Sequence, residues 1–123
     1  MSKTVFLTAL FAAATLATGA MAECTPEQEA AAGKAAGAAA GNLVKQVVPV
    51  QGKQMVNLTD CDVRGGNFKI EFKYNFLGPD GLYWVEASGT IPTSGNGGDV
   101  KIKRMSPNLQ AASAKSGVKL ASN

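Results

Sequence analysis

The sequence predicts an α+β fold in which an N-terminal helix packs on a four-stranded antiparallel meander sheet and a short C-terminal helix follows. Three observations predict this fold. A helix-start signal precedes a long alanine-rich segment, the pattern then changes to alternation of apolar and polar residues, and turn residues separate the alternating runs.

Residues 1–22 carry the three parts of a cleavable signal peptide in order. Lys3 supplies a positive charge, an uncharged apolar run extends from Val5 to Ala17, and Ala20-Met21-Ala22 has the small-x-small pattern of a cleavage site. The apolar run is shorter than a bilayer-spanning helix. We therefore expect a single α+β domain over residues 23–123, periplasmic or secreted, with residues 117–123 frayed.

Cys24 and Cys61 are the two cysteines of the chain, and both follow the predicted cleavage site. An even pair in an exported protein is most simply a disulfide bond, because the compartment is oxidising. A redox-active pair is the alternative, but such cysteines usually lie two residues apart.

The N-terminal helix is expected from Pro26 to about residue 47. Thr25 and Gln28 form a T-x-x-Q capping box, and Pro26 suits the first helical position. Pro49 ends the helix because proline disfavours helical geometry in the residue before it.

Gly33, Gly37 and Gly41 are spaced four apart along one face of this helix. Each glycine costs nearly 1 kcal/mol relative to alanine, so close approach of another backbone is expected. One interpretation is packing against the protein's own sheet, in a hollow left by Ala87 and Gly89. The alternative is a small-xxx-small face that pairs helices, but Lys34 and Lys45 argue against a transmembrane role.

Four strands are expected, at about residues 54–59, 68–77, 82–91 and 100–105, with Asp60 and Asp62 in a solvated turn. The second strand alternates most clearly between apolar and polar residues, and Gly78-Pro79-Asp80-Gly81 is a tight turn after it. Ser106-Pro107 then begins a short helix that ends at Gly117.

The alternation also predicts the register of the central hairpin. Pairing Leu77 with Leu82 puts five further pairs on the apolar face: Phe76 with Tyr83, Tyr74 with Val85, Phe72 with Ala87, Ile70 with Gly89, and Phe68 with Ile91. The same register sets Lys73 opposite Glu86 on the polar face, as an attractive pair.

This register leaves Leu77, Leu82 and Trp84 together on the polar face at the hairpin tip. A contiguous exposed apolar patch often marks an interaction surface, and tryptophan is enriched in binding hot spots. Coverage of these side chains by the C-terminal segment is the alternative.

Catalytic chemistry is restricted by composition. The chain has no histidine, which excludes histidine bases, Ser-His-Asp triads and histidine metal ligands, and bonded cysteines exclude thiolate chemistry. Glu71 and Glu86 are the candidate catalytic carboxylates, but lysines flank or face both. Asp60, Asp62, Gly65 and Glu71 match four positions of an EF-hand calcium loop, yet Arg64 occupies a ligand position and the flanks predict strands. No metal, cofactor or catalytic residue is assigned.

The predicted mature chain keeps 11 basic and 9 acidic residues, a net charge of +2 that gives no argument for nucleic acid or anionic lipid. We therefore expect a non-enzymatic binding module whose partner, an envelope protein or polymer, docks at Leu77, Leu82 and Trp84. The alternative is a structural or membrane-associating protein that self-assembles through the glycine face of the helix.

Overall fold

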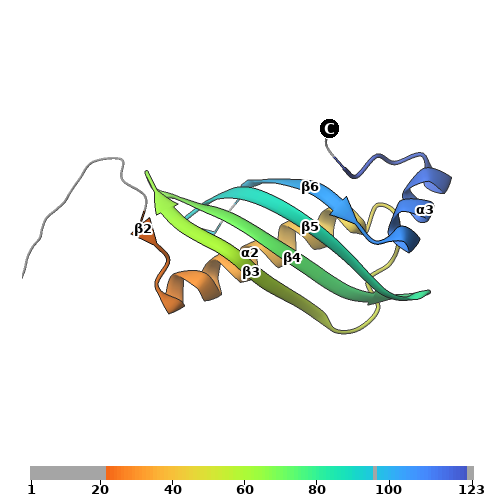
Figure 1. Cartoon of the computed structure of the whole chain (residues 1–123), viewed down its shortest axis with the longest axis horizontal. Helices are drawn as coiled ribbons and strands as arrows, with labels where there is room; N and C mark the ends of the chain where they lie inside the picture. Colours follow the sequence, from red (N-terminus) through yellow and green to blue (C-terminus); the bar gives the residue numbers. More distant parts are fainter. Residues whose placement is uncertain (1–21, 96, 122–123) are drawn as a thin grey trace, which may run out of the picture.

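The structure is a computed structural model that describes residues 22–95 and 97–121. One long helix crosses one face of an antiparallel sheet, and a short helix follows at the end of the chain (Figure 1). The elements in order are β2 (Ala22–Glu23), α2 (Pro26–Val44), β3 (Gln54–Arg64), β4 (Asn67–Gly78), β5 (Gly81–Pro92), β6 (Asp99–Met105) and α3 (Pro107–Ser116).

The strands lie in the order β2-β3-β4-β5-β6, and every neighbouring pair is antiparallel. The α+β class, the helix-sheet-helix order and the meander are therefore confirmed. The expected number of four strands is wrong, because the described residues form a sheet of five.

The additional strand, β2, has only two residues and begins at the residue expected to precede the cleavage site. Ala22 and Glu23 pair with Val63 and Asp62. The reason is the disulfide bond between Cys24 and Cys61, whose Cα atoms are 5.5 Å apart, together with a hydrogen bond from the Cys24 N–H to the Cys61 carbonyl. The bond ties the start of α2 to the middle of β3. The rest of the predicted signal peptide, residues 1–21, lies outside the described residues.

Helix α2 begins as the sequence predicts. Thr25 is the N-cap, its Oγ1 accepts from the Gln28 N–H (3.2 Å), and Gln28 Oε1 accepts from the Thr25 N–H (2.8 Å). The helix ends at Val44, three residues earlier than expected. Beyond it the Val47 N–H donates to the Val44 carbonyl (2.9 Å), three residues back as in a tighter turn, and Pro49 disfavours helical geometry in Val48, the residue before it. No helix of the described residues is both long enough and apolar enough to cross a membrane.

Strand β3 extends to Arg64, so the expected turn at Asp60 and Asp62 is wrong. Both aspartates lie in the strand, Asp60 opposite Glu71 and Asp62 opposite Lys69. A β-bulge at Thr59 shifts the register, so the inward residues are Val56 and Leu58 before it and Cys61 and Val63 after it. This extra residue interrupts the period of two on which the sequence prediction depended.

The hairpin formed by β4 and β5 has the predicted register throughout, from Phe68 opposite Ile91 to Leu77 opposite Leu82. Pro79 and Asp80 form the two-residue loop, and Gly81 takes a positive φ of 99°. Gly78 is required by packing, since a Cβ there would lie 2.7 Å from Tyr83 Cε1.

The core lies between α2 and the apolar face of the sheet. The helix contributes Ala32, Ala36, Ala40 and Val44, all fully buried. The small alanine side chains let the helix approach the sheet closely, where it meets the large ones of β4 and β5. The buried sheet residues are Cys61, Phe68, Ile70, Phe72, Tyr74, Phe76, Tyr83, Val85, Ala87, Ile91, Ile102 and Met105.

Candidate functional site

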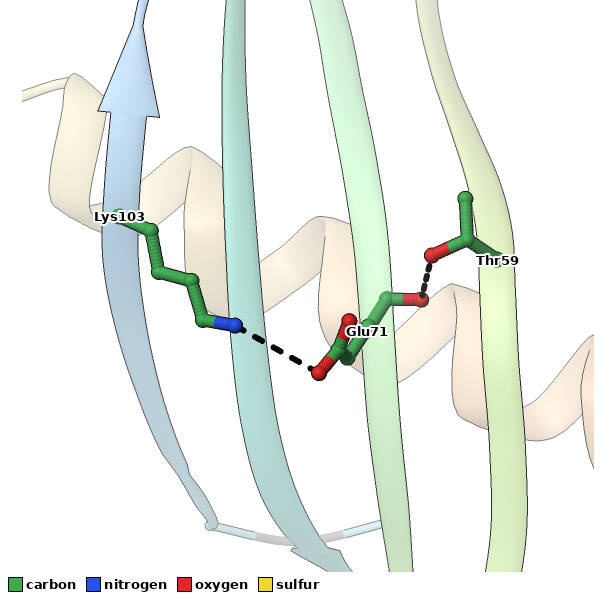
Figure 2. Close-up of polar contacts among 3 residues, drawn as sticks. All are labelled: Thr59, Glu71 and Lys103. Atoms are coloured by element: carbon green, nitrogen blue, oxygen red, sulfur yellow. Dashed lines mark hydrogen bonds and ion pairs between the residues drawn. The ribbon is translucent and has the colours of Figure 1, made fainter.

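The face of the sheet that points away from α2 carries the polar side chains, and we call it the outer face. Figure 2 shows Glu71 on this face, with Lys103 reaching over β5 to place its Nζ 3.5 Å from Glu71 Oε2. Ser88 lies opposite Glu71 on β5. Thr59, at the bulge of β3, donates its hydroxyl to the Glu71 carbonyl (3.1 Å).

The three predicted partner-binding residues lie on the outer face at the end of the hairpin, and we call them the tip patch. Leu77 and Leu82 are direct cross-strand neighbours, and Trp84 follows two residues along β5 on the same side. Leu77 is 41% exposed and Leu82 is 59% exposed, whereas Trp84 is half-buried. The structure thus brings the three side chains together at one end of the sheet.

A cationic side chain lies over the indole ring of Trp84. Lys73 Nζ lies 4.7 Å from the ring centroid, which is within range of a cation–π interaction. Lys73 is opposite Glu86 in the register, as predicted, but the ion pair of Glu86 is with Arg104 (3.4 Å) on β6. Lys73 therefore contacts Trp84 of the tip patch. The predicted pairing of Lys73 with Glu86 did not indicate this contact.

The C-terminal segment reaches the tip patch through the backbone of β5. The Trp84 N–H donates to Ser106 Oγ (3.2 Å), the Ser106 N–H donates to the Trp84 carbonyl (2.9 Å), and Asn108 Nδ2 donates to the Leu82 carbonyl (3.0 Å). These bonds join main-chain groups of β5 to the beginning of α3. The side chain of Leu82 stays exposed despite them.

Met55 is an exposed apolar residue that the sequence prediction missed. It is 60% exposed and lies on the outer face of β3, opposite Asn75, which in turn lies opposite Trp84. A signal was available, because Val56 and Leu58 are inward and Met55 and Asn57 alternate with them. The short run before the bulge made that alternation weak.

The three glycines along one face of α2 lie in two different environments. A Cβ at Gly41 would lie 3.2 Å from Tyr74 Oη, and one at Gly37 would lie 3.1 Å from Val56 Cγ2, whereas one at Gly33 would meet no atom of the described residues within 4 Å. Gly37 and Gly41 thus face β3 and β4. The expected hollow at Ala87 and Gly89 does not receive them, because Val100 and Ile70 flank Gly89.

Tyr74 is the buried polar side chain beneath Gly41. It is fully buried, and its hydroxyl donates to Gln54 Oε1 (2.7 Å). Burial raises the pKa of the Tyr74 phenol, because the phenolate would lose its solvation. The group is enclosed by protein and therefore serves packing.

The candidate catalytic groups that the sequence raised are in ion pairs or in the disulfide bond. Glu71 and Glu86 are each paired with a cation of β6, and both cysteines are in the disulfide. Over residues 22–95 and 97–121, no group of three or more histidine, cysteine, aspartate or glutamate residues is placed to hold a metal ion. The aspartates of the EF-hand-like pattern lie on an extended strand.

No protein-family model, curated protein or solved structure matches this chain.

Proposed function

We propose that this chain is an exported, non-enzymatic binding module of the cell envelope, and that an envelope protein or polymer docks on the tip patch. The observation that carries the proposal is the exposure of Leu77 and Leu82 as neighbours, with Trp84 beside them. Apolar side chains in contact with water at one end of a rigid sheet gain free energy when a partner covers them.

The tip patch is well placed for binding because its support is rigid. The two leucines are held by paired strands and a two-residue loop, and the Trp84 backbone is bonded to Ser106. Lys73 lies over the indole ring of Trp84, in range of a cation–π interaction. Little conformational entropy is therefore lost from this surface on binding, which favours affinity.

The disulfide bond is consistent with export, since such bonds persist in oxidising compartments. The absence of histidine and the bonded state of the cysteines support a non-enzymatic role. Glu71 and Glu86 remain as acids, and each already has a cationic partner.

Self-assembly through Gly33, Gly37 and Gly41 is the other function that the sequence raised. We do not propose it, because Gly37 and Gly41 are already in contact range of Val56 and Tyr74 of the same chain. A second helix on that face would have to displace the sheet.

Site-specific photo-crosslinking in the cell tests the proposal. A photoreactive side chain at Leu82 is expected to form a defined adduct, and one at Lys101, on the outer face of β6, should not. The adduct should disappear when Leu77→Lys is added. Equal labelling from both positions, or no adduct from Leu82, would count against the tip patch.

A further inference from the structure

We propose that β3 carries a second interaction surface, at which two copies of this chain pair edge to edge and join their sheets. This surface is separate from the tip patch, so it stands whether or not the tip patch binds a partner. Strands β3 and β6 are the long strands nearest the two opposite edges of the sheet, and among the described residues only the two-residue β2 lies beyond β3 (Figure 1).

The direction of the backbone groups of β3 follows from the ladder with β4. The Lys53 carbonyl accepts from the Leu77 N–H (3.3 Å), so Lys53 directs its backbone toward β4. Because backbone groups alternate in direction along an antiparallel strand, Gln54, Val56 and Leu58 direct their N–H and C=O groups away from β4. Among the described residues, β2 pairs only with Asp62 and Val63, which leaves the edge from Gln54 to Leu58 unpaired.

The two long edges of the sheet differ in protection. Strand β6 has exposed basic residues at Lys101, Lys103 and Arg104, and Ile102 forms a bridge with Ala121. Lysines and covering segments are the usual means by which proteins block strand addition. Residues 54–58 of β3 contain neither a charge nor a proline. The unprotected edge is therefore the one suited to accept a strand.

On the face of the sheet that α2 covers, there is also open space next to this edge. A hollow runs beside β3 between its residues Val56 and Leu58 and the first half of α2, where Gly33 lines it. Among the described residues, a Cβ at Gly33 would meet nothing within 4 Å, so no close neighbour there offsets the cost of a glycine in the helix. There is therefore space for the backbone of a second chain on the side toward which the N–H and C=O groups of Val56 point.

A second copy fits this edge because the edge is complementary to itself. Antiparallel pairing about Val56 sets Gln54 of one copy opposite Leu58 of the other. Gln54, Val56 and Leu58, whose backbone groups point away from β4, then each exchange hydrogen bonds with the residue opposite. Half-buried Val56 lies at the twofold axis. On the outer face, exposed Met55 of one copy comes beside Asn57 of the second copy.

The charges agree with this register. The hollow at the far end of the edge is acidic, lined by Glu23, Glu29 and Asp60, and Lys53 lies at the near end. Antiparallel pairing brings the Lys53 end of the edge in one copy beside the acidic end of the edge in the other copy. Lys53 of one copy then lies opposite Thr59 of the second copy and next to its Asp60, both charges being on the outer face.

Sedimentation equilibrium of the purified protein over a range of concentrations tests the proposal. We expect a monomer–dimer equilibrium that Val56→Pro abolishes, because proline removes an N–H that points to the open edge and leaves the ladder with β4 intact. Trp84→Ala is the matched control and should leave the dimer constant unchanged. A dimer lost on Trp84→Ala and kept on Val56→Pro would overturn the β3 interface.

Charge reversal provides a test that does not depend on the proline variant folding. Lys53→Glu and Asp60→Lys should each weaken the dimer, roughly fivefold for each exposed ion pair lost, and the double variant should restore it. Within one chain the two residues lie seven positions apart on a strand, too far to interact. Absence of restoration, or a protein that is monomeric at every concentration, would overturn the proposal.

Hydrogen exchange adds a residue-level readout. The N–H groups of Gln54, Val56 and Leu58 should exchange more slowly in the dimer than in the dilute monomer, whereas the N–H groups of Met55 and Asn57, which face β4, should be protected in both. Equal exchange of all five groups at every concentration would contradict pairing at this edge.

Discussion

Ser106 and Trp84 are joined by two hydrogen bonds that extend the ladder between β5 and β6 beyond its last pair. The Ser106 N–H donates to the Trp84 carbonyl (2.9 Å), and the Trp84 N–H donates to Ser106 Oγ (3.2 Å). Ser106 stands at the N-cap position of α3, yet its hydroxyl makes no capping bond. The side chain that would ordinarily cap the helix is used to fix the backbone beneath the tip patch.

Replacement of Ser106 by alanine should therefore destabilise the protein through β5 rather than through α3. Ser106 is only 3% exposed, so loss of its hydroxyl leaves the Trp84 N–H without its partner. We expect the free energy of unfolding to fall by about 1 to 2 kcal/mol. Denaturant unfolding measures the loss, and amide exchange at Trp84 should accelerate.

Ser106→Thr is the control, because it keeps the hydroxyl. Its stability should lie close to that of the natural protein. If alanine and threonine variants are equally stable, the hydroxyl contributes nothing and the Trp84 backbone is held by other contacts.

The glycines of α2 predict opposite effects of the same substitution. Gly33→Ala adds a methyl group in open space and should raise the free energy of unfolding by about 0.5 to 1 kcal/mol, through helix propensity. Gly41→Ala places the methyl group 3.2 Å from Tyr74 Oη and should be destabilising, because it disturbs the hydrogen bond to Gln54. Thermal unfolding of the two variants tests the difference, and a Gly41→Ala variant as stable as Gly33→Ala would contradict it.

The central hairpin was predictable because the alternation and the tight turn together determine its register. Five inward residues of β4 alternate without interruption, a shift by one residue would mix the two faces, and the two-residue loop sets the pairing of Leu77 with Leu82. The disulfide was predictable for a different reason, since two cysteines allow one pairing. Both predictions depended on information that lies within the sequence itself and needs no knowledge of how distant segments pack.

The parts that were not predicted depend on contacts between distant segments. The bulge at Thr59 breaks the alternation of β3, and β2 exists because the disulfide holds Ala22 and Glu23 beside Val63 and Asp62. The positions of the helix glycines over Val56 and Tyr74 follow from how α2 crosses the sheet. Helical spacing shows that glycines share a face, but it does not show which strand that face meets.

The disulfide bond should contribute a large share of the stability of this small domain. It closes a loop with a sequence separation of 37 residues, for which the chain-entropy model gives about 4 kcal/mol. In the Cys24→Ser, Cys61→Ser double variant, we expect the Tm to fall by roughly 15 to 30 °C. Calorimetry of the variant and of the oxidised protein measures this.

The reduced natural protein is the matched control for that experiment. It should unfold at a temperature similar to that of the double variant, since both lack the same cross-link. A double variant as stable as the oxidised protein would show that β2 and the start of α2 are held to β3 without the bond.

The buried phenol of Tyr74 should make the free energy of unfolding fall at alkaline pH. Burial raises the pKa of its phenol above the ordinary value of 10.0, so the unfolded chain releases this proton at a lower pH than the folded chain does. Below pH 10 both states keep the proton and the contribution to stability is complete. As the pH rises through 10 toward the folded-state pKa, only the unfolded state ionises, and the free energy of unfolding falls.

Tyr74→Phe removes this group while keeping the ring. At neutral pH the variant should lose about 1 kcal/mol, because Gln54 Oε1 loses its donor. Above pH 10 its stability should fall less steeply than that of the natural protein, so that the two curves converge. All other titratable groups are the same in the two proteins, and the difference between the curves therefore isolates Tyr74. Urea unfolding between pH 8 and pH 11 measures it, and parallel curves would show that the phenol ionises as easily in the folded chain as in the unfolded one.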